Sequence, residues 1–188
     1  MSQKSLFGQK YDGAVFSPCR TWRYTLWRKF PDNPDGKNVM FLMLNPSTAT
    51  ELMNDPTVRR TIGFAMDWGA SQLVVTNLFA YRATLPADMM ADEDPTGPDN
   101  DKHIREQAAQ ADLIICAWGN DGAHLERAKH VVRMLEKDER PLHYLKITGS
   151  GEPGHPLYLK ADMRPQRLIT HEGLLQTDIE HFTLKHKE

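Results

Sequence analysis

Four short, mainly apolar segments recur along the chain, three of them as continuous apolar runs, and each of them stops at polar or turn-forming residues. They occupy residues 39–44, 73–78, 113–118 and 142–147. Continuous apolar runs of this length are typical of parallel strands that are buried on both faces. Because the segments between the runs have helical features, strands and helices alternate along the chain. We therefore expect an α/β fold, a three-layer α/β/α sandwich with a central, mainly parallel four-stranded sheet.

Helix signals support this alternation. Asp55 followed by Pro56 is typical of an N-cap and a first helical position, and apolar residues at helical spacing follow. Residues 101–111 and 123–137 are predicted to form two further helices. A strand is expected at residues 21–30, where large and charged residues alternate. Residues 83–100, rich in Pro, Asp and Gly, form a long loop of the kind that is often functional.

Length and composition narrow the class of protein. A chain of 188 residues fits a single domain over residues 1–188, with a core at about 20–160. The net charge of −2 gives no strong overall attraction to nucleic acid, although a local basic stripe can suffice. Cys19 and Cys116 match no metal-binding spacing, and we expect a reducing, cytoplasmic location. No apolar run is long enough for a membrane span, and we expect no membrane partner.

Polar residues follow each of the four apolar strands. They are Asn45, Asn77, the pair Trp118 and Gly119, and His155. In open α/β sheets, ligands bind outside the carboxyl ends of the strands. Each residue also has a structural explanation: Asn45 as a loop cap, Asn77 as a satisfied buried amide, Trp118 as core and His155 as an exposed loop residue. Because all of them fall at one edge of the expected sheet, we predict a ligand site there.

These strand-end motifs resemble the uracil-DNA glycosylase superfamily, in the expected order over residues 41–159. "FLMLNPS" looks like its first motif, and "LVVTNL" like the strand whose Asn reads the uracil edge. "LIICAWGNDGAH" is similar to its Trp-Gly strand, and "GHPLYL" to its second catalytic motif. The wording of "LNPSTA", "NLFAYRAT" and "HPLYL" also looks like an uncharacterised family of bacterial and phage proteins, a domain of unknown function.

The resemblance implies roles for individual residues. Asn45, placed by Pro46, would orient a water molecule against the sugar C1′, and His155 would donate a hydrogen bond to O2 of the leaving base. Asn77 would bind the pyrimidine edge that carries N3 and O4. Phe79 or Tyr81 would stack on a flipped base. Ser47 and Thr48 stand where the fast uracil enzymes carry Asp and Tyr.

Residues between the second strand and the next helix have no counterpart in that superfamily. Tyr81, Arg82, Asp99 and Asn100 would build a pocket for a bulkier or more charged ligand. Arg82 would either bind a phosphate bidentately or form a salt bridge with the acidic residues 92–94.

Two classes of function follow. The first is a DNA glycosylase-like hydrolase that acts on the N-glycosidic bond of a uracil-like or modified pyrimidine, in DNA or in a free nucleotide. The alternative is a module on the same fold that binds a nucleotide, a modified base or a protein without hydrolysis. We expect no cofactor and no metal, because the sequence has no glycine-rich phosphate loop, metal-ligand cluster or nucleophile elbow.

Overall fold

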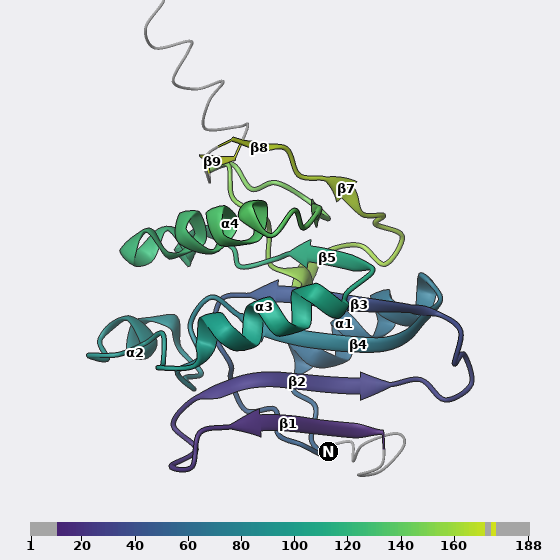
Figure 1. The fold of residues 1–188 in the computed structure, drawn as a ribbon, viewed down its shortest axis with the longest axis horizontal. Helices are drawn as coiled ribbons and strands as arrows, with labels where there is room; N and C mark the ends of the chain where they lie inside the picture. The colour runs from purple at the N-terminus through teal and green to yellow at the C-terminus, as the bar shows by residue number, and fades with distance from the viewer. Residues whose placement is uncertain (1–10, 172–173, 176–188) are drawn as a thin grey trace, which may run out of the picture.

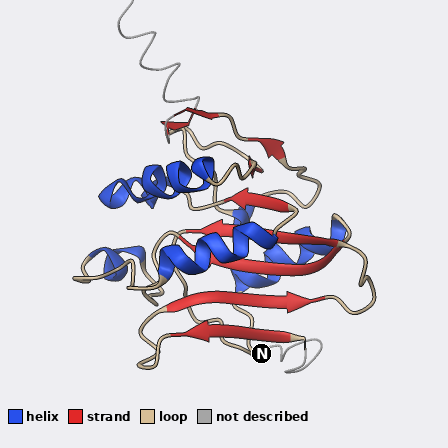
Figure 2. Cartoon of the chain, viewed as in Figure 1, coloured by secondary structure: helices blue, strands red, loops and turns tan. Residues whose placement is uncertain are grey.

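The computed structural model describes residues 11–171 and 174–175, and they adopt an α/β fold (Figures 1 and 2). Within these residues, seven strands form one mixed sheet in the order β1-β2-β4-β3-β5-β6-β7. The strands are β1 (Asp12–Phe16), β2 (Arg23–Lys29), β3 (Lys37–Met43), β4 (Ala70–Asn77), β5 (Leu113–Cys116), β6 (Leu142–Tyr144) and β7 (Gln166–Arg167). A separate two-stranded sheet pairs β8 (Thr170–His171) with β9 (Leu174–Leu175).

The four apolar runs form the parallel centre of the sheet. β3 pairs in parallel with β4 and β5, and β5 pairs in parallel with β6. The expected four-stranded sheet is nevertheless too small, because antiparallel β1 and β2 extend it on one side and antiparallel β7 on the other. The strand expected at residues 21–30 is confirmed as β2. β1 and β7 escaped prediction because neither carries an apolar run.

Helices cover both faces of the sheet. The described residues contain four α-helices: α1 (Pro56–Asp67), α2 (Pro86–Met90), α3 (Asn100–Gln110) and α4 (Arg127–Lys137). Two 3-10 helices, η1 (Asn120–Glu126) and η2 (Pro156–Tyr158), complete the helical segments described. Figure 1 shows α3 crossing in front of the sheet, with α1 behind it.

Alternation along β3 divides the core into two layers. Met40 and Leu42 pack with side chains of α3 and α4, whereas Phe41 packs with α1 on the opposite face. The Phe41 ring also stacks on Trp68, at 5.9 Å between centroids, where α1 ends. Burying each such side chain contributes roughly 1.5–3 kcal/mol, so the two layers fix α1 and α3 across the sheet.

The helix boundaries partly follow the sequence prediction. Asp55 is the N-cap of α1, because its side chain accepts a hydrogen bond of 2.8 Å from the Val58 backbone N–H. The helix expected at residues 123–137 instead begins as η1, and α4 starts at Arg127. The long loop at residues 83–100 contains α2. Among the described residues, no helix combines the length and the apolar character that crossing a bilayer requires.

Candidate functional site

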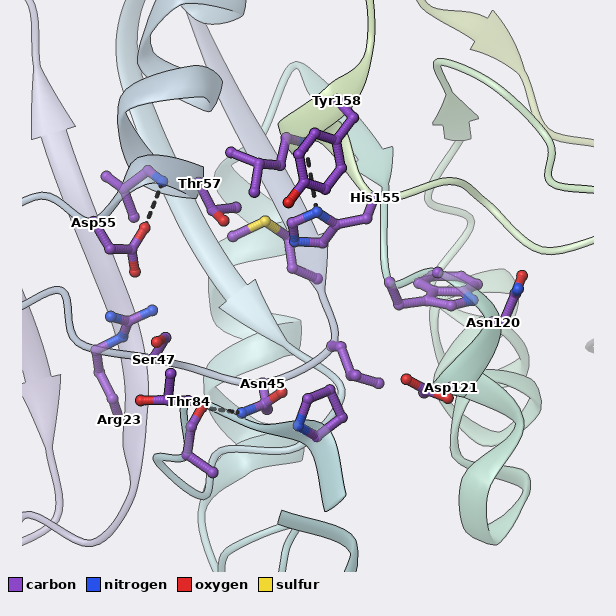
Figure 3. Close-up of a pocket in the computed structure, with 18 residues that line it drawn as sticks. Arg23, Asn45, Ser47, Asp55, Thr57, Thr84, Asn120, Asp121, His155 and Tyr158 are labelled. Atoms are coloured by element: carbon purple, nitrogen blue, oxygen red, sulfur yellow. Dashed lines mark hydrogen bonds between the residues drawn. The ribbon is translucent and has the colours of Figure 1, made fainter. Parts of the chain in front are cut away.

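A cavity of about 520 Å³ lies at the carboxyl ends of β3 and β5 (Figure 3). One wall consists of the segment after β3, the start of α1 and residues 83–86. The other wall consists of the turn after β5 and the segment that holds η2. Five of the site residues predicted from sequence line this cavity: Asn45, Ser47, Trp118, Gly119 and His155.

Asn45 is held by its own loop. Its Nδ2 donates hydrogen bonds to the backbone oxygens of Pro46, at 3.1 Å, and of Ala83, at 2.8 Å. Pro46 is buried, and its carbonyl also accepts a bond from the Ala83 N–H. Because both donors of the amide are engaged, only its oxygen is left to act on a ligand or a water molecule.

His155 stands on the opposite wall with a defined tautomer. Its Nδ1 accepts a hydrogen bond of 3.4 Å from the Leu157 backbone N–H at the start of η2. A neutral imidazole that accepts at Nδ1 carries its proton at Nε2, which can donate. Burial lowers the pKa of His155, and the charge of Asp55 opposes that shift. The Nε2–H of this tautomer can therefore donate a hydrogen bond into the cavity that His155 lines (Figure 3).

The turn after β5 supplies Trp118 and Gly119. The buried Trp118 indole donates a hydrogen bond of 2.6 Å to a carboxylate oxygen of Glu152. Gly119 has φ +75°, in the left-handed region that favours glycine, and a β-carbon built on it would lie 3.8 Å from Cβ of His155. The positive φ therefore accounts for the glycine, because 3.8 Å is an ordinary van der Waals distance.

Six predicted site residues lie outside the lining of the main cavity: Pro46, Asn77, Phe79, Tyr81, Arg82 and Asn100. Asn77 is fully buried at the end of β4, and neither polar atom of its side chain has a hydrogen-bond partner. Asn100 is equally buried, and its Nδ2 donates to the backbone oxygens of Asn77 and Leu78. Phe79 is a core residue whose ring lies 5.5 Å from that of His124. Neither Asn77 nor Phe79 lines the main cavity, where a base would be bound.

Tyr81 and Arg82 line a second hollow of about 400 Å³. This hollow shares Ser47, Ala83 and Thr84 with the main cavity, so the two are adjacent. Nη1 of Arg82 donates to the Arg20 carbonyl, at 3.1 Å. Within residues 11–171, Arg82 forms no salt bridge with the acidic residues 92–94, so that alternative is wrong.

Three charged residues of the cavity lining were not predicted as site residues from the sequence: Arg23, Asp55 and Asp121. The β1–β2 register shifts by one residue where Val15 pairs with Thr25 but Phe16 pairs with Arg23. This irregularity directs Tyr24 onto His103 of α3, while Arg23 faces the other way and donates to the Ala49 carbonyl. A bulge in an edge hairpin leaves no reliable mark in the sequence.

Arg23 and Asp55 are both almost completely buried beside the cavity. Burial lowers the pKa of Arg23 to about 10, while the charge of Asp55 opposes the shift and those of Arg82 and Arg28 add to it. Asp55 had been interpreted only as an N-cap, yet its carboxylate also points toward Arg23 in Figure 3. Within the part of the chain that the structure describes, no group of three or more His, Cys, Asp or Glu side chains could hold a metal ion.

Comparison with known proteins places the chain in a family without assigning it an activity. No curated protein and no solved structure matches it. None of the comparisons connects it with the uracil-DNA glycosylase superfamily. A family model described as "Protein of unknown function (DUF1643)" matches residues 23–157, the segment that contains the whole parallel sheet and nearly the whole cavity lining. The chain belongs to this family.

Proposed function

We propose that this protein binds a nucleotide or nucleobase in the main cavity and hydrolyses the N-glycosidic bond of a uracil-like or modified pyrimidine. The observation that carries the proposal is His155 on a cavity wall opposite Asn45 and Asp55, with Nδ1 accepting from the Leu157 N–H and Nε2 left to donate. A cavity of about 520 Å³ falls in the range of pockets for small organic ligands. The strand-end motifs that resemble the uracil-DNA glycosylases support the same reaction.

His155 would stabilise the leaving group. When the bond between C1′ and the pyrimidine nitrogen breaks, its electron pair leaves with the base, and negative charge gathers on O2. The Nε2–H of His155 would donate to this oxygen, which is an oxyanion-type effect worth about 3–4 kcal/mol in comparable sites. Because desolvation lowers the pKa of His155, the neutral imidazole is favoured, and its Nε2–H can donate without a change of protonation.

Asp55 would act as the general base, a role that the amide of Asn45 cannot fill. The amide of Asn45 accepts protons poorly, and its free oxygen would orient the attacking water. The water oxygen would form the new bond to C1′, and its proton would pass to the Asp55 carboxylate. One oxygen of that carboxylate already accepts the Val58 N–H, which holds the group in a fixed direction.

The alternative is a module that binds a nucleotide, a modified base or a protein without hydrolysis. The observation in its favour is that both amide donors of Asn45 are engaged with the backbone of Pro46 and Ala83. In that case Asn45 shapes the pocket and orients no water. DNA, a free nucleotide or a nucleobase are the partners that we propose for either class.

Base release distinguishes the two classes. The folded protein would be incubated with DNA that contains uracil, thymine mismatches or modified pyrimidines, and with the free nucleotides, while released base and abasic sites are measured. We expect His155→Ala and Asp55→Asn each to slow release about 100- to 1,000-fold. His130→Ala, at an exposed histidine paired with Asp101, is the matched control and should release base at the normal rate.

No release from any of these substrates by a folded protein would refute the hydrolase. Binding of the same nucleotides without release would instead support the alternative.

A further inference from the structure

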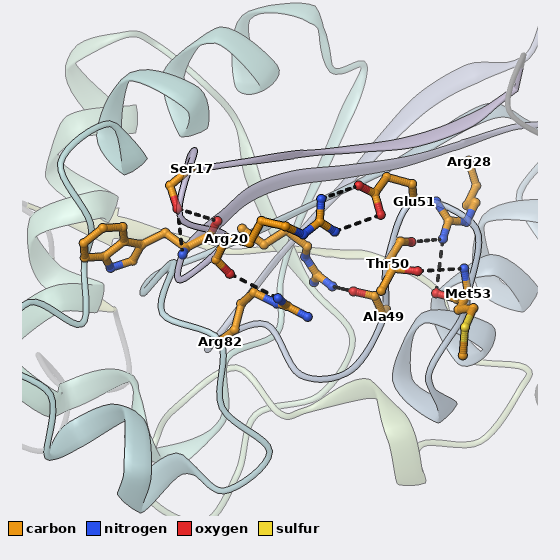
Figure 4. A network of polar contacts seen from close by, with 10 residues as sticks. Ser17, Arg20, Arg28, Ala49, Thr50, Glu51, Met53 and Arg82 are labelled. Atoms are coloured by element: carbon orange, nitrogen blue, oxygen red, sulfur yellow. Dashed lines mark hydrogen bonds and ion pairs between the residues drawn. The ribbon is translucent and has the colours of Figure 1, made fainter.

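Several arginines lie around the segment between β3 and α1, among them Arg20, Arg28 and Arg82 (Figure 4) and the buried Arg23. Arg20 forms a bidentate pair with Glu51, at 2.8 and 3.1 Å. Arg28 lies 3.9 Å from Asp12 and also donates to the Thr50 carbonyl. Among the described residues, neither Arg23 nor Arg82 has a carboxylate within salt-bridge distance.

Arg23 is poorly satisfied for a buried guanidinium. It is 1% exposed, donates one hydrogen bond, to Ala49, and has an Nε without a partner. A guanidinium offers five N–H donors, and a buried charge without partners is costly. Asp55 acts on it only from beyond salt-bridge distance. Since Arg23 lines the main cavity, a ligand that enters there can provide the missing acceptors.

Arg82 approaches the same place from the second hollow. Its Nε is also buried without a partner, while its guanidinium lies over the Phe16 ring, 5.0 Å from the ring centroid. Ser47, Ala83 and Thr84 form the wall shared by the two spaces, and Ser47 and Thr84 add hydroxyl donors. Asp55 lines the main cavity but not this hollow.

We infer that the wall of Ser47 and Thr84, between Arg23 and Arg82, is a phosphate subsite, and that the ligand in the adjacent cavity is a nucleotide. The inference rests on the proposed function for the base-binding half of the ligand. The guanidinium fork matches phosphate oxygens, and a phosphate has enough oxygens to accept from two arginines and two hydroxyls. A phosphate at the shared wall leaves the base and the sugar in the space between Asn45 and His155.

Calorimetric titration tests the subsite with four probes: inorganic phosphate, deoxyuridine, deoxyuridine 5′-monophosphate and a short oligodeoxyuridine whose internal phosphates are diesters. We expect the monophosphate or the oligonucleotide to bind at least about 10-fold more tightly than deoxyuridine, because a charge-assisted hydrogen bond contributes about that factor. Preference for the monophosphate identifies a free nucleotide, and preference for the oligonucleotide identifies a nucleic acid strand.

Arginine variants test whether the tighter binding of the phosphorylated probe depends on the side chains at this wall. Arg82→Met keeps an unbranched apolar side chain but removes the guanidinium that lies over Phe16, and it should weaken binding of the preferred probe about 10- to 100-fold. The affinity of Arg82→Lys for this probe should lie between those of Arg82→Met and the wild type, because lysine keeps the positive charge but cannot donate two parallel hydrogen bonds. Arg105→Met is the matched control, because Arg105 is an exposed arginine on α3 that pairs with Asp138. If Arg23→Met fails to fold, the Arg82 variants and Ser47→Ala still test whether this wall binds the phosphate.

The subsite is wrong if neither phosphorylated probe binds more tightly than deoxyuridine, or if Arg82→Met behaves like Arg105→Met. Its failure can be told apart from failure of the hydrolase. Arg82-dependent phosphate binding without base release keeps the subsite and rejects hydrolysis. Base release that is equally fast from deoxyuridine and from its monophosphate keeps hydrolysis and rejects the subsite.

Discussion

The Leu78 carbonyl, just after β4, accepts hydrogen bonds from two side chains that come from different helices. Nδ2 of Asn100, at the start of α3, donates to it at 2.9 Å, and Nε of Arg127, at the start of α4, donates at 2.7 Å. Leu78 and Asn100 are fully buried and Arg127 is 6% exposed, so water cannot replace either donor. The two helices are therefore coupled through one backbone oxygen.

The magnitude follows from how many acceptors each substitution leaves unpaired. Asn100→Ala removes two bonds but leaves Leu78 with the Arg127 donor, so the free energy of unfolding should fall by about 1–3 kcal/mol. Arg127→Met should cost about 2–3 kcal/mol, because its ion-pair partner Asp101 is partly exposed and can be hydrated. Only the double variant leaves the Leu78 oxygen without either donor. The free energy of unfolding of the double variant should fall by about 1–3 kcal/mol more than the sum of the decreases in the two single variants.

Urea unfolding of the wild type, both single variants and the double variant completes the thermodynamic cycle. Asn38→Ala is the matched control, because Asn38 also donates to a backbone oxygen, that of Gln110, but in a bond open to solvent. It should cost less than about 1 kcal/mol and should not couple to Arg127→Met. A coupling energy within about 0.5 kcal/mol of zero between Asn100 and Arg127 would refute the shared-acceptor account.

This cycle also bears on a residue that the sequence placed in the ligand site. Asn100 lies in a Pro- and Gly-rich loop region whose composition suggested a pocket, but in the fold it is the first residue of α3 and ties β4 to that helix. Sequence reasoning could not distinguish these roles, because a buried amide can satisfy either a ligand or the backbone. The packing of α3 against the end of β4 determines that the Asn100 side chain bonds to the backbone.

What the sequence predicted well depends on local physics. Apolar runs specify buried parallel strands, and the Asp55-Pro56 pair specifies the start of α1, because both effects act within a few residues. The cavity at the carboxyl ends of β3 and β5 follows from topology alone, which explains why Asn45, Gly119 and His155 meet there.

What escaped prediction depends on long-range pairing. The edge strands β1 and β7 are held by backbone pairing with β2 and β6, which needs no apolar pattern. Arg23 reaches the cavity only because the β1–β2 register shifts beside it. Asn77 pairs with Met43 at the end of β4 but does not line the main cavity, a result that the spacing of residues could not reveal.

The two cysteines, and His155 together with Asp55, give pH-dependent tests of the structure. A hydrogen bond with Ser17 helps to lower the pKa of the exposed Cys19 thiol to about 7, while burial raises that of Cys116. Alkylation of Cys19 by iodoacetamide should therefore rise through about pH 7 while Cys116 stays unmodified in the folded protein, and a rise centred near pH 9 would contradict this environment. For His155, burial lowers the folded pKa below that of the unfolded chain, so the unfolded state binds more protons and this contribution to stability falls as the pH drops below about 6.5. Titration of its imidazole by NMR should give a midpoint below 6.5. Asp55→Asn keeps an N-cap side chain but removes the negative charge that favours the imidazolium, so the midpoint should fall further. An unchanged or higher midpoint would show that Asp55 and His155 do not face one cavity, and with that the carboxylate assigned to the attacking water would be lost.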